Sequence, residues 1–223
     1  MTLNKNKQCI KYFVLAVIIL GCLYSSKIAD LFIPLFDNIY YGNLVSMFIA
    51  IASAIVWGVE IAIILFVCKK IGIEIFTKQQ GKKELPLIRV IILFVLTILP
   101  MIVISACIGW KVKIVYALGV KVTTVGLVCN VCEILAYAVR LVLMLMFIVC
   151  IQKGCEMLIK SKFVIPYGAI LALITFGLID FFALGMDLRA FYLVASFLYG
   201  VIYLLADRKF STTWILSYLI YLL

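Results

Sequence analysis

The chain has 223 residues, of which 67% are apolar, and it carries 20 Lys and Arg against 10 Asp and Glu, with no His. About half of a soluble domain is apolar, so this composition excludes a water-facing globular fold and predicts several segments in a lipid bilayer. The positive charge lies in the breaks between apolar runs, which favours contact with anionic lipid headgroups and argues against nucleic-acid binding.

Seven apolar segments follow one another along the chain. Their predicted bounds are about 12–26, 44–67, 88–110, 124–151, 164–184, 190–205 and 212–223. No small-residue cleavage site follows the first segment, so we interpret it as a retained helix and not as a signal peptide. The last two are shorter than the roughly twenty residues of a full span. The pattern predicts an all-α, polytopic membrane helical bundle of six to seven transmembrane segments, forming a single domain over residues 1–223.

The distribution of basic residues predicts the orientation of the bundle. Fourteen of the 20 Lys and Arg lie in alternate breaks that begin with the N-terminal tail, and five lie in the other breaks. This asymmetry favours a multi-pass protein of the cell membrane with a cytoplasmic N-terminus and an external C-terminus. A re-entrant final segment would return the C-terminus to the inside. The composition, rich in Ile, Lys and Tyr, is typical of a low-GC bacterium.

The cysteines give no indication of a metal site. Nearly all of the eight fall within or at the ends of apolar runs, where cysteine behaves as a small apolar side chain. Cys129 and Cys132 form an isolated CxxC without a second Cys or His pair. The sequence also lacks phosphate-binding and dinucleotide-binding glycine motifs, so no metal and no cofactor is predicted.

Ionisable residues inside the apolar segments are candidate functional groups, because the bilayer interior penalises charge. The fourth segment has the clearest pattern, with four polar residues at i, i+3, i+7 and i+10: Asn130, Glu133, Tyr137 and Arg140. This spacing puts them on one helical face. One interpretation is a charge-neutral clamp between helices, and the other is the wall of a polar pocket. Glu60 and Asp180 are further ionisable residues within apolar segments.

Four short patterns stand in order in the last third of the chain. They are Glu156 to Lys160 (EMLIK), Phe176 to Asp180 (FGLID), Tyr199 to Tyr203 (YGVIY) and Ser217 to Tyr221 (SYLIY). In order and helical spacing they resemble the CAAX-protease and bacteriocin-processing family of intramembrane metalloproteases, over residues 155–223. By this resemblance, Asp180 and Ser217 occupy the two histidine positions of the family, and Tyr221 occupies its asparagine position. Glu156 and Lys160 stand where the family has its Glu-Glu-x-x-x-Arg motif.

The resemblance implies a family of proteases, but the chain lacks the histidines that would hold a metal or activate water there. Whether the chain is an enzyme stays open at this stage. The leading hypothesis is a non-proteolytic binding, immunity or regulatory protein, with a membrane peptide or protein as partner. One alternative is a small transporter or transport subunit that uses the face of Glu133 and Arg140. Another is an intramembrane hydrolase that uses acidic residues, Glu156 or Glu133 with Asp180.

Overall fold

The computed structural model describes residues 2–25, 42–76, 87–107, 124–159, 164–183 and 186–222. Seven helices run through these residues, and no strand occurs among them. The helices are α1 (Thr2–Ser25), α3 (Gly42–Ile71), α4 (Leu87–Cys107), α6 (Thr124–Leu158), the continuous helix of α7 (Tyr167–Ala172), η2 (Leu173–Gly177) and α8 (Leu178–Ala183), α9 (Met186–Leu205) and α10 (Phe210–Leu222). The all-α prediction is confirmed.

Among the described residues, three helices are long and apolar enough to cross a membrane. Their apolar stretches are Asn6–Ser25, Val45–Ile71 and Gly126–Leu158. In the described part of the chain, four shorter apolar stretches accompany them: Leu87–Leu99, Tyr167–Gly177, Leu193–Leu205 and Phe210–Leu222. The six or seven predicted spans therefore divide into helices long enough to cross a membrane and shorter apolar helices. The shorter stretches are those of the third segment and of the three closing segments.

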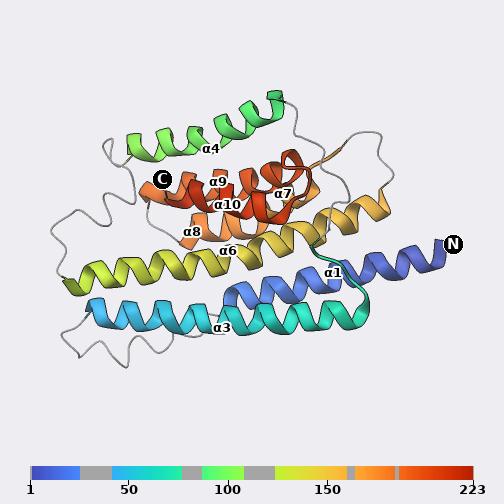
Figure 1. Cartoon of the computed structure of the whole chain (residues 1–223), viewed down its shortest axis with the longest axis horizontal. Coiled ribbons are helices and arrows are strands. Elements are labelled where there is room, and N and C mark those ends of the chain that lie inside the picture. The colour runs from blue at the N-terminus through green and yellow to red at the C-terminus, as the bar shows by residue number, and fades with distance from the viewer. Residues whose placement is uncertain are drawn as a thin grey trace.

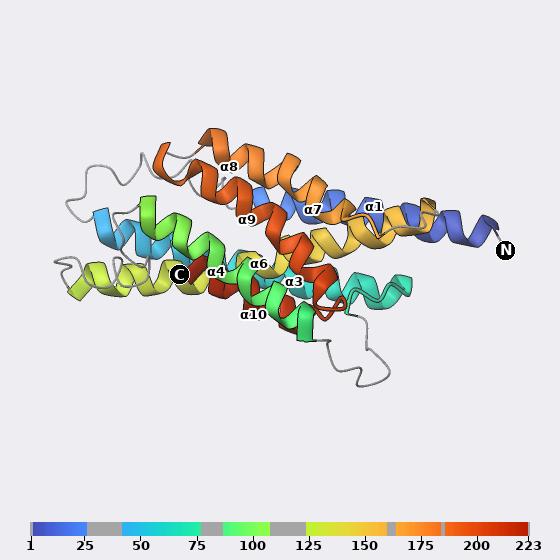
Figure 2. The ribbon, with the colours of Figure 1, turned by 90° about the horizontal axis from the view of Figure 1, so that it is seen from above.

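Helix α6 lies in the middle of the bundle. It packs against α1 and α3 on one side and against α7 and α10 on the other (Figure 1). Helix α9 lies between the α7–α8 helix and α4, and it contacts both (Figure 2). The core consequently follows the second half of α6, where the run from Leu143 to Cys150 is completely buried.

Successive helices alternate in direction, which gathers the basic residues at one end of the bundle. At this end the beginning of α1 meets the end of α6, where the Cys9 thiol donates to the Gly154 carbonyl at 3.3 Å. Helix α10 also begins there and runs away from it, toward the point marked C (Figure 1). We call this the basic end. Its basic residues with described side chains are Lys7, Lys11, Lys69, Lys70, Arg89, Lys153, Arg208 and Lys209.

The end of α3 shows how the basic end is closed. Gly72 has a φ of +69°, and the Ile73 amide donates to the Cys68 carbonyl at 2.9 Å. This is a Schellman termination, which favours glycine because other residues are strained at positive φ. The chain beyond it is held by Lys153, whose Nζ donates to the Glu74 carbonyl at 2.5 Å. The basic side chains thus also tie helix ends together.

Helices α7 and α9 approach each other closely through small residues. A Cβ added to Gly200 would lie 2.4 Å from Cα of Ala169. Small residues permit such backbone contact, which is a common way to join helices in a membrane. Beside this contact, the π-helical turn Leu173–Gly177 carries Phe176, whose buried ring meets Phe147 edge to face at 5.1 Å. The FGLID pattern therefore begins with two buried residues at the end of this wide turn, Phe176 and Gly177, and its next two residues, Leu178 and Ile179, are exposed.

Candidate functional site

A pocket of about 310 Å³ opens between α3 and α6 near the end of α10. Among its lining residues are the polar or amphipathic side chains Ser46, Ser53, Trp57, Glu133, Tyr137, Arg140 and Tyr221. We call it the polar pocket. Three of the four residues predicted on the polar face of α6 line it, and Asn130 does not. The helical spacing therefore places these three side chains on the same pocket wall in the folded chain.

Tyr137 connects three helices at the floor of this pocket. Its ring stacks on Tyr221 of α10, with centroids 3.5 Å apart and ring planes at 7°. Its hydroxyl lies 3.1 Å from the hydroxyl of Tyr199 on α9, so the two groups share a hydrogen bond. Both Tyr137 and Tyr199 are buried. Since a buried hydrogen bond of this kind needs both partners fixed, the floor of the pocket is rigid.

Glu133 and Arg140 give the pocket wall one charge of each sign. The Glu133 carboxylate is exposed and accepts from the Cys129 thiol at 3.7 Å. Arg140 lies two helical turns further along α6 and is half-buried. With the two groups on one wall, a ligand that has both a donor and an acceptor can contact each of them.

Trp57 of α3 lines the pocket, and its indole N–H is buried beneath the pocket surface. The residue is 7% exposed, and its Nε1 is buried without a hydrogen-bond partner among the described residues. An indole N–H without a partner in an apolar setting costs free energy, so buried tryptophans usually donate to an acceptor. One turn away, Oε2 of Glu60 is likewise buried without a partner in the described part of the chain. Both atoms lie beneath the accessible surface, and Glu60 is not among the lining residues of the polar pocket.

Sequence reasoning missed the contribution of α3. Ser46, Ser53 and Trp57 follow one another at intervals of seven and four residues, which is the spacing of a single helical face. This regular spacing is the sequence pattern that could have indicated a polar face on α3. Serine and tryptophan are common in membrane helices, so the pattern gains meaning only once α3 is placed against α6.

The described positions that the family resemblance singled out lie in several parts of the bundle. Glu156 lies at the basic end, where its Oε1 accepts from Arg208 and from Gln152, each at 2.7 Å. Ser217 is completely buried, and its Oγ has no hydrogen-bond partner within the described ranges. Tyr221 lines the polar pocket instead. Lys160 lies outside the described residues.

Asp180 lies in α8, and its side chain is outside the described atoms. Its backbone position is nevertheless informative. The Gln152 amide that contacts Glu156 also accepts from the Gly168 backbone N–H at 3.0 Å, so Glu156 lies close to the start of α7. Asp180 is twelve residues further along the continuous helix, roughly 18 Å at 1.5 Å per residue. The arrangement separates Asp180 from Glu156.

No group of three or more Cys, Asp or Glu side chains suited to holding a metal ion occurs in the described part of the chain. The polar groups of the candidate site are the side chains already named around Tyr137, which come from α3, α6 and α10. Hydrogen bonding and ion pairing are therefore the chemistry that these groups offer.

No family model, no curated protein and no solved structure matches this chain. The resemblance to the CAAX-protease family consequently stays a prediction from motif order. Function has to be argued from the site itself.

Proposed function

We propose that the chain is a multi-pass protein of the cell membrane that binds a membrane peptide, or a segment of a membrane protein, in the polar pocket without cleaving it. The gathering of Trp57, Glu133 and Arg140 around one pocket carries this proposal. A peptide bond offers a carbonyl acceptor for Arg140 and an N–H donor for Glu133, in a lipid environment where water is scarce.

The other groups of the pocket suit the same class of ligand. Arg140 adds cationic donors, and the Glu133 carboxylate accepts from an amide or amine. A volume of about 310 Å³ holds a few side chains or a short backbone segment, at the lower end of the range for small-ligand sites. Two long apolar helices, α3 and α6, form its walls, so a membrane-embedded segment can reach it from the side.

Absence of cleavage is proposed from the positions of the acidic groups. Glu156 is engaged by Arg208 and Gln152, and the backbone of Asp180 lies about three turns from that cluster. A hydrolytic site needs its acid and base within reach of one substrate bond. We therefore retain the relationship to the CAAX-protease family as a proposal of ancestry only, with immunity or regulation as the role. Asp180→Ala is expected to leave the cleavage pattern of host membrane proteins unchanged, and a lost cleavage product would contradict this.

Photo-crosslinking in intact cells tests the binding proposal. Benzoyl-phenylalanine replaces Ser53, in the pocket, or Ile55, which is 62% exposed on the same helix outside the pocket. We expect an adduct of defined mass from Ser53 only, and its loss when Arg140→Gln is added. Equal adducts from both positions, or an adduct that persists in the Arg140→Gln background, would show that the pocket does not select the partner.

A small transporter is the second candidate, favoured by the opposite charges of Glu133 and Arg140 on one open wall. Transport predicts solute uptake into vesicles that contain the purified protein, and loss of uptake with Glu133→Gln. The peptide-binding proposal predicts no uptake in either case.

A further inference from the structure

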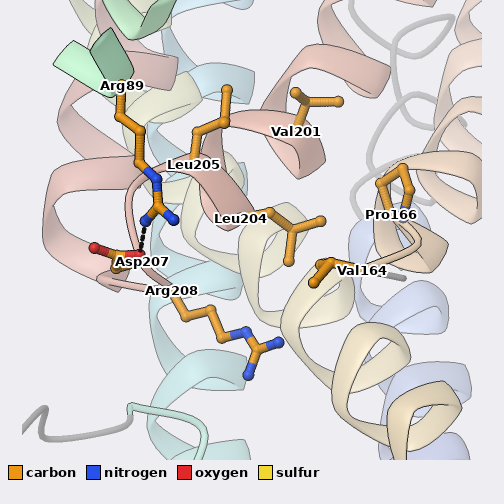
Figure 3. A pocket seen from close by; sticks show the side chains of 8 residues that line it. All are labelled: Arg89, Val164, Pro166, Val201, Leu204, Leu205, Asp207 and Arg208. Atoms are coloured by element: carbon orange, nitrogen blue, oxygen red, sulfur yellow. Dashed lines mark hydrogen bonds and ion pairs between the residues drawn. The ribbon is translucent and has the colours of Figure 1, made fainter. Parts of the chain in front are cut away.

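A second cavity, of about 500 Å³, lies at the basic end and is separate from the polar pocket (Figure 3). The start of α4, the end of α9, the turn between α9 and α10 and the segment before α7 form it. Arg89, Asp207 and Arg208 provide its polar side, and apolar residues such as Val164, Val201 and Leu204 provide the rest. We call it the amphipathic cavity.

Each of the two arginines forms an ion pair with a carboxylate. One terminal nitrogen of Arg89 contacts Asp207 at 2.5 Å, and one terminal nitrogen of Arg208 contacts Glu156 at 2.7 Å. Asp207 and Arg208 both have positive φ, at 53° and 62°, which sets this tight turn directly after α9. A guanidinium has five N–H donors, and a single ion pair uses only part of them. The side chains are 44% and 45% exposed, so both can also face a ligand.

The position of the cavity along the helices corresponds to the headgroup level of a bilayer. The apolar stretch of α4 begins at Leu87, and that of α9 ends at Leu205. Directly beyond these residues comes the charged turn of Asp207 and Arg208. Apolar walls that meet two guanidinium groups at such a boundary match the form of a phospholipid, with acyl chains on one side and a phosphate on the other.

Charge favours an anionic lipid over a zwitterionic one. Two carboxylates, Asp207 and Glu156, balance the two arginines locally. The basic end as a whole is nevertheless positive, because it has eight Lys and Arg with described side chains and only three such acidic residues, Glu74, Glu156 and Asp207. Lys153 adds to this field within the electrostatic range of Arg208 and Glu156. A net negative headgroup is attracted to such a surface.

We infer that the amphipathic cavity binds an anionic phospholipid, with the phosphate between Arg89 and Arg208 and an acyl chain along Val201 and Leu204. The inference assumes that the chain lies in a membrane, as proposed above, but it concerns a different site. Its outcome is therefore independent of whether the polar pocket binds a peptide.

Native mass spectrometry of the purified full chain tests this inference. Dioleoyl-phosphatidylglycerol and dioleoyl-phosphatidylcholine, which share their acyl chains, are added at equal concentration. We expect the anionic lipid to be retained about tenfold or more above the zwitterionic lipid, and the double variant Arg89→Gln/Arg208→Gln to lose this preference. The matched control Lys7→Gln/Lys70→Gln removes the same charge from the same end outside the cavity, and it is expected to change retention by less than about twofold.

Three results would overturn the inference. They are a preference that survives in the arginine variant, an equal loss in the lysine control, and equally strong binding of soluble glycerol phosphate, which would indicate a site for free phosphate. If the arginine variant does not fold, Val201→Trp tests lipid binding in the cavity independently. It keeps both arginines and fills the cavity, so anionic-lipid retention should fall to the level of phosphatidylcholine, and unchanged retention would refute the site.

Discussion

Replacing Gly200 by alanine is the sharpest test of how α7 and α9 pack. An added Cβ would lie 2.4 Å from Cα of Ala169 and 2.6 Å from its backbone nitrogen. Ordinary contacts begin at 3.4 Å, so the two backbones must separate by about 1 Å. Overpacking costs about 1–3 kcal/mol, and the obstacle here is backbone instead of a flexible side chain. We therefore expect a destabilisation of about 2–3 kcal/mol.

The matched control is Gly21→Ala in α1, where an added Cβ meets nothing within 4 Å. Alanine favours helix more than glycine does, so this variant should be neutral or more stable by up to about 1 kcal/mol. Thermal unfolding in detergent, followed by helical circular dichroism, should lower the apparent Tm of Gly200→Ala by about 4–12 °C. A Tm within about 1 °C of the parent, with Gly21→Ala behaving alike, would refute direct backbone contact between α7 and α9.

Three further predictions concern the site, the helix ends and the orientation. Tyr137→Phe and Tyr199→Phe should each destabilise the chain, and a double-mutant cycle should give a coupling of about 0.5–1.5 kcal/mol, whereas strict additivity would exclude the hydroxyl contact. Gln152→Leu removes the acceptor of the buried Gly168 N–H and should cost about 1–3 kcal/mol in the same unfolding assay, and an unchanged Tm would contradict it. The basic end is expected to face the cytoplasm. A green fluorescent protein fused after Lys209 should therefore fluoresce in bacterial cells, and alkaline phosphatase fused at the same position should be inactive. The reverse pattern would contradict the proposed orientation.

Much of the fold could be predicted because its signals are local in the chain. Each apolar run needs only its own side chains to become a helix in lipid, and the alternation of basic breaks needs only counting. The seven predicted segments accordingly reappear as seven helices in the described residues, with the basic residues gathered at one end. The polar face of α6 could also be predicted, since Glu133, Tyr137 and Arg140 repeat with the helical period.

The partners of these residues could not be predicted, because they depend on which helices touch. Tyr221 stacks on Tyr137, although the two are distant in sequence and the motif order had assigned Tyr221 to a protease frame. Glu156 is bound by Arg208 and not placed beside Asp180. Trp57, which sequence reasoning passed over, lines the polar pocket.

The sequence by itself therefore determined a bundle of apolar helices with basic residues at one end and a stripe of polar residues along one face of α6. Hydropathy and charge specify each helix and its direction without reference to any other helix. The tertiary structure alone decided that the stripe faces α3 and α10, that two arginines line a second cavity, and that Arg208 binds the Glu156 carboxylate. The physical reason is that close contacts such as Gly200 on Ala169 set the register between helices, and that register decides which side chains meet.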